Sequence, residues 1–193
     1  EYMRLKLEAE YPSIVGKKII TYAPTFRGRP SERKNFKCEL DYTKIVDMLD
    51  DDYVVILKLH PAVNENSVYI PEEYKDKVLN LTRYNDINDL LIITDVLISD
   101  YSSVIFEYAL LEKPMIFFAY DLESYVDERN FYYNYEDFVP GPIVKTNDEI
   151  INLIKGDNFD LDKVRTFRNE FFEDIDGKST ERLVEFLIKG SLE

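Results

Sequence analysis

The sequence is poor in cysteine, histidine and long apolar runs. Its one cysteine, Cys38, excludes an intrachain disulfide and is typical of a reducing compartment. No apolar run reaches the roughly 18 residues of a membrane span, and no signal peptide is recognised at the N-terminus. Neither Cys38 nor the only histidine, His60, has companions at metal-ligand spacing, so we expect no metal and no cofactor. These absences favour a cytoplasmic protein.

Positive charge is also scarce. The 193 residues include 24 Lys and Arg against 38 Asp and Glu, a net charge of −14 at pH 7. This balance argues against general affinity for nucleic acid or anionic lipid, but it leaves room for a small basic site. With 45% hydrophobic residues, residues 1–193 suffice for one globular domain. The start at Glu1 without methionine and the final Leu192-Glu193 suggest a fragment of a longer protein.

Strand patterns alternate with helix patterns along most of the chain. Apolar runs predict strands at 18–23, 53–59, 78–81, 96–99, 115–120 and 143–145. Helical spacing predicts helices at 1–10, 41–49, 86–93, 102–111, 146–155, 162–172 and 179–188. Asp86 is the expected N-cap of one helix, and Thr146 and Glu149 form a capping box at another. The alternation indicates an α/β fold, a doubly wound parallel sheet covered on both faces.

The most informative stretch is residues 95–107, Asp-Val-Leu-Ile-Ser-Asp-Tyr-Ser-Ser-Val-Ile-Phe-Glu. A buried strand ends at Ser99, and a very short turn brings Ser102 and Ser103 to a helix N-terminus. Its unpaired N–H groups and dipole attract anions, and serine hydroxyls donate further hydrogen bonds to phosphate. Glu107 lies four residues after Ser103, about 6 Å along the helix axis, within reach of a ribose hydroxyl. The stretch predicts a nucleotide diphosphate site without a glycine-rich loop.

Further polar groups are expected at the same edge of the sheet. Parallel sheets bind ligands at the carboxyl ends of their strands, where Thr25-Phe26-Arg27 follows the first strand and His60 the second. Arg27 opens a basic loop, and its guanidinium can hold phosphate oxygens with two hydrogen bonds. The other basic residues of this loop, which would face an anionic polymer or lipid head group, are Arg29, Arg33, Lys34 and Lys37.

Each candidate also has a plain structural interpretation. A lone histidine is more often structural than catalytic, and Ser102 and Ser103 can serve as helix caps. Glu107 can be a surface residue, although its apolar neighbours suggest a covered helix on which a partly buried carboxylate needs a partner. The basic loop can simply be solvated. The aromatic-rich segment 121–138 is explained either as a buried irregular loop or as a surface that contacts a ligand or another domain.

Several ordered blocks resemble the CDP-glycerol glycerophosphotransferases, the teichoic acid primases and polymerases of Gram-positive bacteria. The blocks are Tyr-Ala-Pro-Thr-Phe-Arg (22–27), Leu-His-Pro (59–61), Leu-Ile-Ser-Asp-Tyr-Ser-Ser (97–103), Phe-Glu (106–107), Lys-Pro-Met-Ile-Phe (113–117) and Tyr-Asp (120–121). The resemblance covers about residues 18–172. It implies the Rossmann-like C-terminal half of a GT-B fold, which binds the donor, with the N-terminal acceptor domain absent.

The resemblance implies that glycerol phosphate is transferred from CDP-glycerol to a hydroxyl of a lipid-linked or polymeric acceptor in teichoic acid synthesis. Some relatives use CDP-ribitol. The full enzymes act at the inner face of the cell membrane, so membrane contact is indirect, and no nucleic-acid partner is expected. The donor-binding domain alone is expected to bind CDP-glycerol weakly and to be inactive, because the general base is expected in the absent domain.

The resemblance also implies roles for particular residues. His60 matches the histidine that contacts the pyrophosphate, and as an imidazolium it would stabilise the transferred phosphoryl group or assist departure of CMP. The implied phosphate contacts are Arg27, Ser99, Ser102 and Ser103. The implied ribose and base contacts are Glu107, Arg83, Asp86 and Ile87. The implied contacts on the donor-glycerol or acceptor side are Asp121 and Arg129.

Two other function classes are compatible with the same residues. A GT-B glycosyltransferase that uses a nucleotide sugar would need the same helix N-terminus and glutamate. A nucleotide-binding or interaction domain without catalysis is the second alternative. Competition between CDP-glycerol and UDP-sugars would separate the first from the glycerophosphotransferases, and the sequence upstream of Glu1 would test the second.

Overall fold

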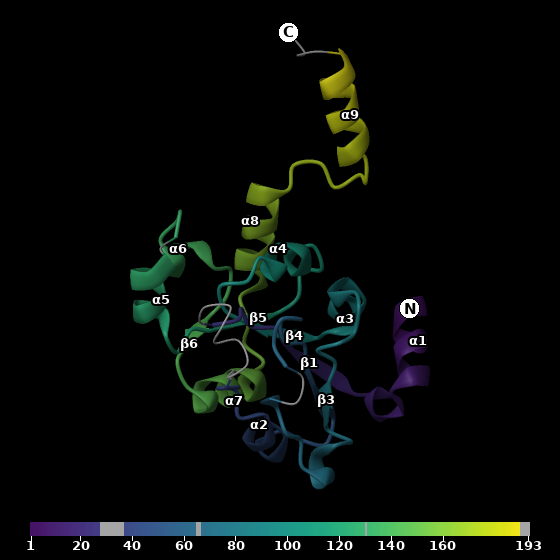
Figure 1. Ribbon diagram of the computed structural model, residues 1–193, viewed down its shortest axis with the longest axis vertical. Helices are drawn as coiled ribbons and strands as arrows, with labels where there is room; N and C mark the ends of the chain where they lie inside the picture. Colours follow the sequence, from purple (N-terminus) through teal and green to yellow (C-terminus); the bar gives the residue numbers. More distant parts are fainter. Residues whose placement is uncertain (28–36, 65–66, 130, 190–193) are drawn as a thin grey trace.

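The computed structural model describes residues 1–27, 37–64, 67–129 and 131–189 (Figure 1). Within these residues one all-parallel sheet has the strand order β3-β2-β1-β4-β5-β6. Its strands are β1 (Lys18–Tyr22), β2 (Tyr53–Leu57), β3 (Val78–Asn80), β4 (Val96–Ser99), β5 (Met115–Phe118) and β6 (Ile143–Val144). The order reverses between β1 and β4. The predicted doubly wound α/β fold is confirmed.

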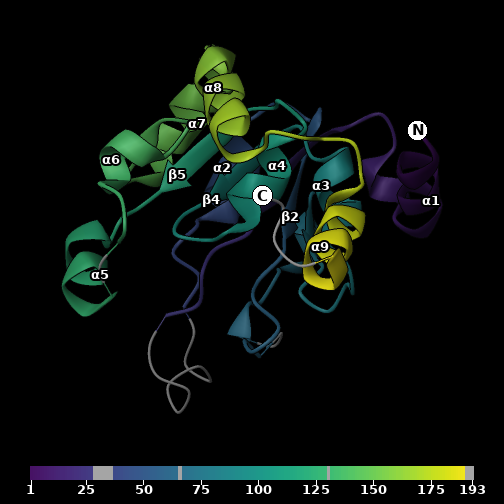
Figure 2. The ribbon, with the colours of Figure 1, turned by 90° about the horizontal axis from the view of Figure 1, so that it is seen from above.

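Helices cover both faces of this sheet (Figures 1 and 2). The helices are α1 (Tyr2–Glu10), α2 (Tyr42–Met48), α3 (Ile87–Ile93), α4 (Val104–Ala109), α5 (Leu122–Arg129), α6 (Tyr135–Phe138), α7 (Asn147–Gly156), α8 (Leu161–Phe171) and α9 (Ser179–Lys189). Short 3-10 helices lie at Pro12–Ile14 and Glu72–Tyr74. Because β-strand side chains alternate between faces, both faces of the apolar strands need such a cover.

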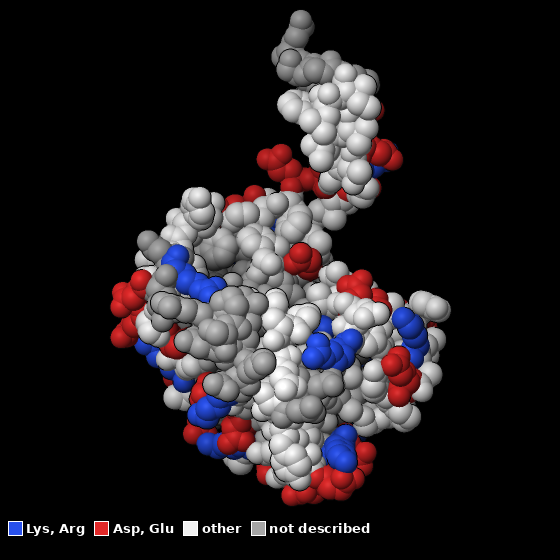
Figure 3. Space-filling model, in the orientation of Figure 1, with Lys and Arg blue, Asp and Glu red and all other residues white. Residues whose placement is uncertain are grey.

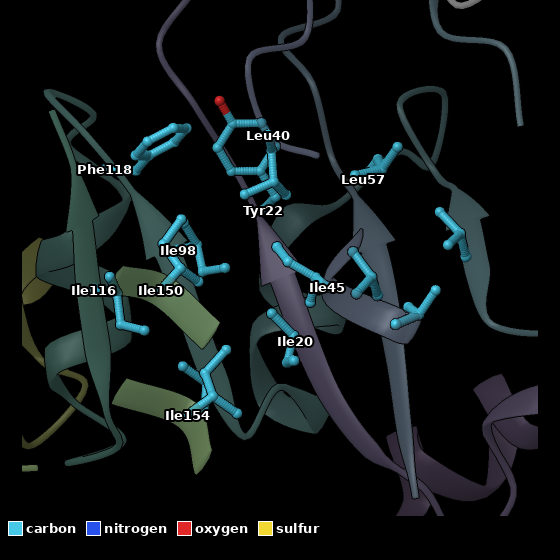
Figure 4. Close-up of a cluster of buried hydrophobic side chains, with 14 of the residues drawn as sticks. Ile20, Tyr22, Leu40, Ile45, Leu57, Ile98, Ile116, Phe118, Ile150 and Ile154 are labelled. Carbon is cyan, nitrogen blue, oxygen red and sulfur yellow. The ribbon is translucent and has the colours of Figure 1, made fainter. Parts of the chain in front are cut away.

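Alternate residues of the strands divide the core into layers. Ile20 of β1 and Ile98 of β4 pack with α2 and α7, as the cluster in Figure 4 shows. Ile19 packs on the opposite face against α1 and α3, and Leu97 lies in a cluster with α4 and α8. The two faces together bury every residue of β4, including Ser99. Burial on both faces explains why the strands are continuously apolar rather than alternating.

The strand register brings the ends of neighbouring strands to one edge. Tyr22, the last residue of β1, pairs with Leu57 of β2 and with Ile98 of β4. Ile98 in turn pairs with Ile116 of β5. The segments that follow β1, β2 and β4 therefore meet at the carboxyl edge, at the point where the strand order reverses.

The predicted starts of α3 and α7 are confirmed, but the two helices that follow β5 were not predicted. Asp86 caps α3 by accepting from the Asn88 amide, and Thr146 and Glu149 form the capping box of α7. The segment 121–138 is not an irregular loop throughout, because it contains α5 and α6. Its mixed polar and aromatic sequence lacks the 3.6-residue apolar stripe that would have predicted those helices.

The last helix, α9, extends away from the sheet (Figure 1). Its apolar side chains, among them Leu183, Phe186 and Ile188, are exposed. In the space-filling view this helix presents a mostly uncharged surface (Figure 3). Across the described residues, no helix combines the length and the apolar character required to cross a membrane.

Gly141 allows two segments of the chain to approach closely. A Cβ at this position would lie 2.4 Å from the carbonyl oxygen of Met115 and 3.2 Å from the Phe117 ring. We expect Gly141→Ala to lower the free energy of unfolding by about 1–3 kcal/mol, because backbone must move to admit the methyl group. Urea unfolding followed by circular dichroism measures this change. Gly156→Ala in α7, where nothing lies within 4 Å of the added Cβ, is the control and should be neutral or stabilising. Equal losses for both variants would contradict the expectation.

Candidate functional site

A cleft of about 480 Å³ lies at the carboxyl edge of the sheet, where the strand order reverses. The segment after β1 contributes residues 23–26, and the segment after β2 contributes residues 58–61. Asn85 and Ile87 line it from the start of α3, and residues 101–103 line it from the β4–α4 turn. Ligands of doubly wound sheets bind at this place, because the connections that leave the two neighbouring strands run to opposite faces of the sheet and leave a crevice between them.

The serine turn forms one wall of the cleft. Ser102 is half-buried and Ser103 is exposed, and both line the cavity. Ser102 Oγ accepts a long hydrogen bond of 3.4 Å from the Val104 amide, and Ser103 stands at the N-cap position of α4 without a side-chain cap. Among the described residues neither hydroxyl is therefore committed to a strong internal bond, and the phosphate contacts of both serines stay predictions.

Ser99 does not join the two serines in the cleft. Its side chain is buried, and its hydroxyl donates to the carbonyl of Ala23 at 2.9 Å. Ser99 therefore links β4 to the end of β1 instead of facing a ligand. Its place as the last residue of a strand with both faces covered accounts for this burial.

His60 lines the opposite wall, in the turn that ends β2. Its ring lies 4.6 Å from the Phe26 ring, and the Ala62 amide donates to its Nδ1 at 3.1 Å. An imidazole that accepts a hydrogen bond at Nδ1 carries its ring hydrogen on Nε2. The imidazolium expected from the sequence would have to give up the bond to Ala62. A neutral ring can still donate from Nε2 to a phosphate oxygen.

Asp100 joins the two segments that border the cleft. Only 1% of the residue is exposed, and its Oδ1 accepts from the amides of Thr25 at 2.7 Å and Tyr101 at 2.6 Å. Its Oδ2 lies 2.8 Å from Arg27 Nη2, where attraction of charge rather than an aligned hydrogen bond joins the two groups. Burial raises the pKa of Asp100, and the positive charge of Arg27 opposes that rise.

Arg27 is held by protein groups and does not line the cleft. Its Nε and Nη2 donate to Asp121 at 2.6 and 3.1 Å, and its Nη1 donates to the Thr25 carbonyl at 2.6 Å. The guanidinium also lies 4.8 Å from the centre of the Tyr101 ring. Burial acts to lower the pKa of Arg27, but Asp121 and Asp100 outweigh burial and raise it. The structure thus gives Arg27 a positioning role, and its predicted phosphate contact stays a prediction.

Asp121 and Arg129 lie on the β5 side of this cluster. Asp121 also accepts from the Tyr101 hydroxyl at 2.9 Å. Burial acts to raise the pKa of Asp121, yet the hydrogen bonds and charge of Arg27 lower it overall. Arg129 lies 5.6 Å from the centre of the Phe26 ring, which in turn lies 4.6 Å from the His60 ring. Their predicted contacts with glycerol or acceptor stay predictions.

The loop before α3 is divided between two hollows. Ile87 lines the cleft, and its contact with the ribose or base stays a prediction. Arg83 and Asp86 line a neighbouring hollow of about 570 Å³ that shares Asn85 with the cleft. Arg83 also donates to the Pro61 carbonyl at 3.1 Å, so it links this loop to the His60 turn.

Glu107 is exposed, which corrects the expectation of a partly buried carboxylate. The helix α4 spans only Val104–Ala109, shorter than predicted, and Glu107 lies outside the lining of the cleft. A six-residue helix is packed along Val104, Ile105 and Tyr108, which leaves Glu107 on the solvent side. Its predicted ribose contact stays a prediction.

The predicted site residues did not include Lys58 and Tyr101. Lys58 and Tyr101 line the cleft. Lys58 had a signal, since it is the one charged residue inside the apolar run that ends at His60. Of the predicted basic loop, Arg29, Arg33 and Lys34 lie outside the described residues. Among the described residues, no group of three or more His, Cys, Asp or Glu could hold a metal ion.

The buried charge of Asp100 should destabilise the fold when Arg27 is removed. We expect Arg27→Met to lower the free energy of unfolding by about 3–5 kcal/mol, because it leaves that charge without a partner. Adding Asp100→Asn to the same chain should recover part of the loss. Lys44→Met, which breaks the exposed pair with Asp148, is the control and should cost under about 1 kcal/mol. If urea unfolding shows equal effects for Arg27→Met and the control, the ion cluster does not hold the site together.

Solved structures of one protein match this chain over almost its whole length. The structure of the wall teichoic acid polymerase TagF matches with a TM-score of 0.81 and 31% sequence identity, over 98% of this chain and 47% of that chain. A TagF variant soaked with CDPG matches with a TM-score of 0.79 and 30% identity, over 97% of this chain and 47% of that one.

Sequence relatives agree with the structural match. The teichoic acid poly(ribitol-phosphate) polymerase of Bacillus spizizenii is 44% identical over 97% of this chain and 30% of its own length. The ribitol-phosphate polymerase TarK of Staphylococcus aureus is 39% identical over 97% of this chain and 37% of its own length. The chain therefore spans less than half the length of these relatives. Residues 3–189 match the family described as CDP-Glycerol:Poly(glycerophosphate) glycerophosphotransferase, and the chain belongs to this family.

Proposed function

We propose that this chain is the donor-binding part of an enzyme that transfers glycerol phosphate from CDP-glycerol to a hydroxyl of a lipid-linked or polymeric acceptor in teichoic acid synthesis. One observation carries the proposal: the cleft at the reversal of strand order brings His60, Ser102 and Ser103 together in a member of this family. A pyrophosphate fits between donors from two walls of such a crevice.

The proposed reaction is an in-line phosphoryl transfer. The acceptor oxygen forms a bond to the β-phosphorus while the bond from that phosphorus to the bridging oxygen breaks, and CMP leaves with the bonding electrons. His60 Nε2 and the serine hydroxyls donate hydrogen bonds to the phosphate oxygens as their charge shifts. The acceptor proton passes to a base that we place in the part of the relatives that this chain does not cover, which also supplies the acceptor site.

The membrane enters this proposal only through the acceptor. A lipid-linked polymer would bring the complete enzyme to the inner face of the cell membrane, and the described residues contribute no helix that could span it. No metal is required in the proposed mechanism, since the charge of the pyrophosphate is met by hydrogen-bond donors and basic side chains. Binding of CDP-glycerol that is unchanged by EDTA would agree with this, and loss of binding would contradict it.

Binding to this chain tests the donor class directly. By isothermal titration calorimetry we expect weak binding of CDP-glycerol, and we expect His60→Ala and Glu107→Gln to weaken it by about 10-fold each, the range of a hydrogen bond to a charged group. His60→Ala in the complete enzyme should also lower turnover sharply. Glu112→Gln, on the far side of α4 in an ion pair with Arg165, is the control and should leave binding unchanged. Near-normal turnover would remove the catalytic role of His60, and stronger competition by UDP-sugars would overturn the donor class.

CDP-ribitol is a second candidate donor. The ribitol-phosphate polymerases and primase named among the relatives are 39–44% identical to this chain, whereas the glycerol-phosphate enzymes are 34–38% identical. Titration of CDP-ribitol against CDP-glycerol distinguishes the two. Tighter binding of CDP-ribitol favours ribitol phosphate as the transferred group, and tighter binding of CDP-glycerol favours glycerol phosphate.

A further inference from the structure

A buried cation, Lys58, forms part of the cleft wall next to His60. Its backbone amide donates to the Tyr22 carbonyl at 2.9 Å, so strand pairing continues through this residue. Lys58 directly follows β2 and lies two residues before His60, which lines the same cleft. Only 6% of Lys58 is exposed, yet it lines the cavity.

The ammonium group is fixed in place by two carbonyls. Lys58 Nζ donates to the Thr82 carbonyl at 3.0 Å and to the Tyr84 carbonyl at 2.7 Å, both in the loop before α3. An ammonium group has three N–H bonds, so these contacts account for two of them. In the described part of the chain no carboxylate forms an ion pair with Lys58. Burial lowers the pKa of Lys58, and the positive charge of Arg83 lowers it further.

A second lysine, Lys113, has similar hydrogen-bond partners but different charged neighbours. Its Nζ also donates to two backbone carbonyls, those of Ile92 at 3.2 Å and Thr94 at 2.6 Å. Burial lowers the pKa of Lys113 as well; the negative charge of Asp95 opposes this change, and the positive charge of Arg4 adds to it. Lys113 precedes β5, at the amino edge of the sheet and away from the cleft. The negative charge of Asp95 thus acts on Lys113, whereas no carboxylate of the described residues acts on Lys58 in this way.

We propose that Lys58 binds the diphosphate of the nucleotide, supplying the positive charge on the β2 side of the cleft that faces the serine turn. A buried charge without a counter-charge is unfavourable, and a phosphate oxygen in the cleft supplies that counter-charge. The two carbonyls hold the ammonium in position before the ligand arrives, which limits the entropy lost on binding. The inference rests on the proposed function in placing a nucleoside diphosphate in this cleft.

The test distinguishes the effect of the Lys58 charge on phosphate binding from the effect of its hydrogen bonds to the loop before α3. The chain and its Lys58→Met variant are titrated with CDP and with cytidine by calorimetry at one ionic strength. We expect the affinity for CDP to fall by about 10- to 100-fold, because a charge-assisted contact is lost. Cytidine has no phosphate, so its affinity should change by less than about 3-fold. Lys58→Arg should recover part of the CDP affinity, and Lys113→Met is the matched control that should change neither ligand.

Other outcomes overturn the inference. An equal loss of CDP and cytidine affinity would mean that Lys58 acts only by holding the loop before α3, and unchanged CDP affinity would remove any role in binding. If Lys58→Met does not fold, Lys58→Gln keeps two N–H donors without the charge and carries the same expectations. Titration with ADP and UDP separates this inference from the proposed function. Lys58-dependent binding of those nucleotides without preference for CDP would support the inference and reject the proposed donor, whereas no diphosphate binding by the unmodified chain would reject both.

Discussion

The buried carboxylate of Asp100 is the constraint on which the site depends. It lies directly after β4, where strand order reverses, and its Oδ1 accepts from the amides of Thr25 and Tyr101. Its charge is met by Arg27, which also binds Asp121 after β5. A carboxylate removed from water must keep such partners. The segments that follow three neighbouring strands are therefore fixed relative to one another, and the serine turn is held opposite His60.

The distribution of charge reconciles an acidic chain with a site for an anion. The net charge is −14, yet Lys58 and His60 line the cleft and Arg83 lies next to it. Acidic side chains are spread over the surface, and Asp100 and Asp121, which follow β4 and β5 at this edge of the sheet, are neutralised by Arg27. Local potential in a crevice is set by the nearest uncompensated charges and not by the total. The buried carboxylates thus order the edge without making it negative.

Much of the fold could be predicted from the sequence because its strands and most helices carry strong periodic signals. Val96–Ser99 was predicted with both ends correct, and Asp86 and Thr146 mark helix starts by chemistry that acts within three residues. The helices α5 and α6 were missed, since aromatic residues there are placed by contacts such as Tyr101 against Tyr125 and Phe131. Those contacts join residues more than 20 positions apart, and no local pattern records them.

The sequence by itself determined the alternation of strands and helices, the position of polar residues after each strand, and the membership of a family. Those properties follow from local spacing and from ordered blocks of residues. Only the tertiary structure decided how each polar side chain is used. Ser99 donates a hydrogen bond to the Ala23 carbonyl, and Arg27 forms ion pairs with two carboxylates. Glu107 is exposed to solvent, and Lys58 lines the cleft. The physical reason is that partners and burial are set by segments distant in sequence, which meet only when the sheet has formed.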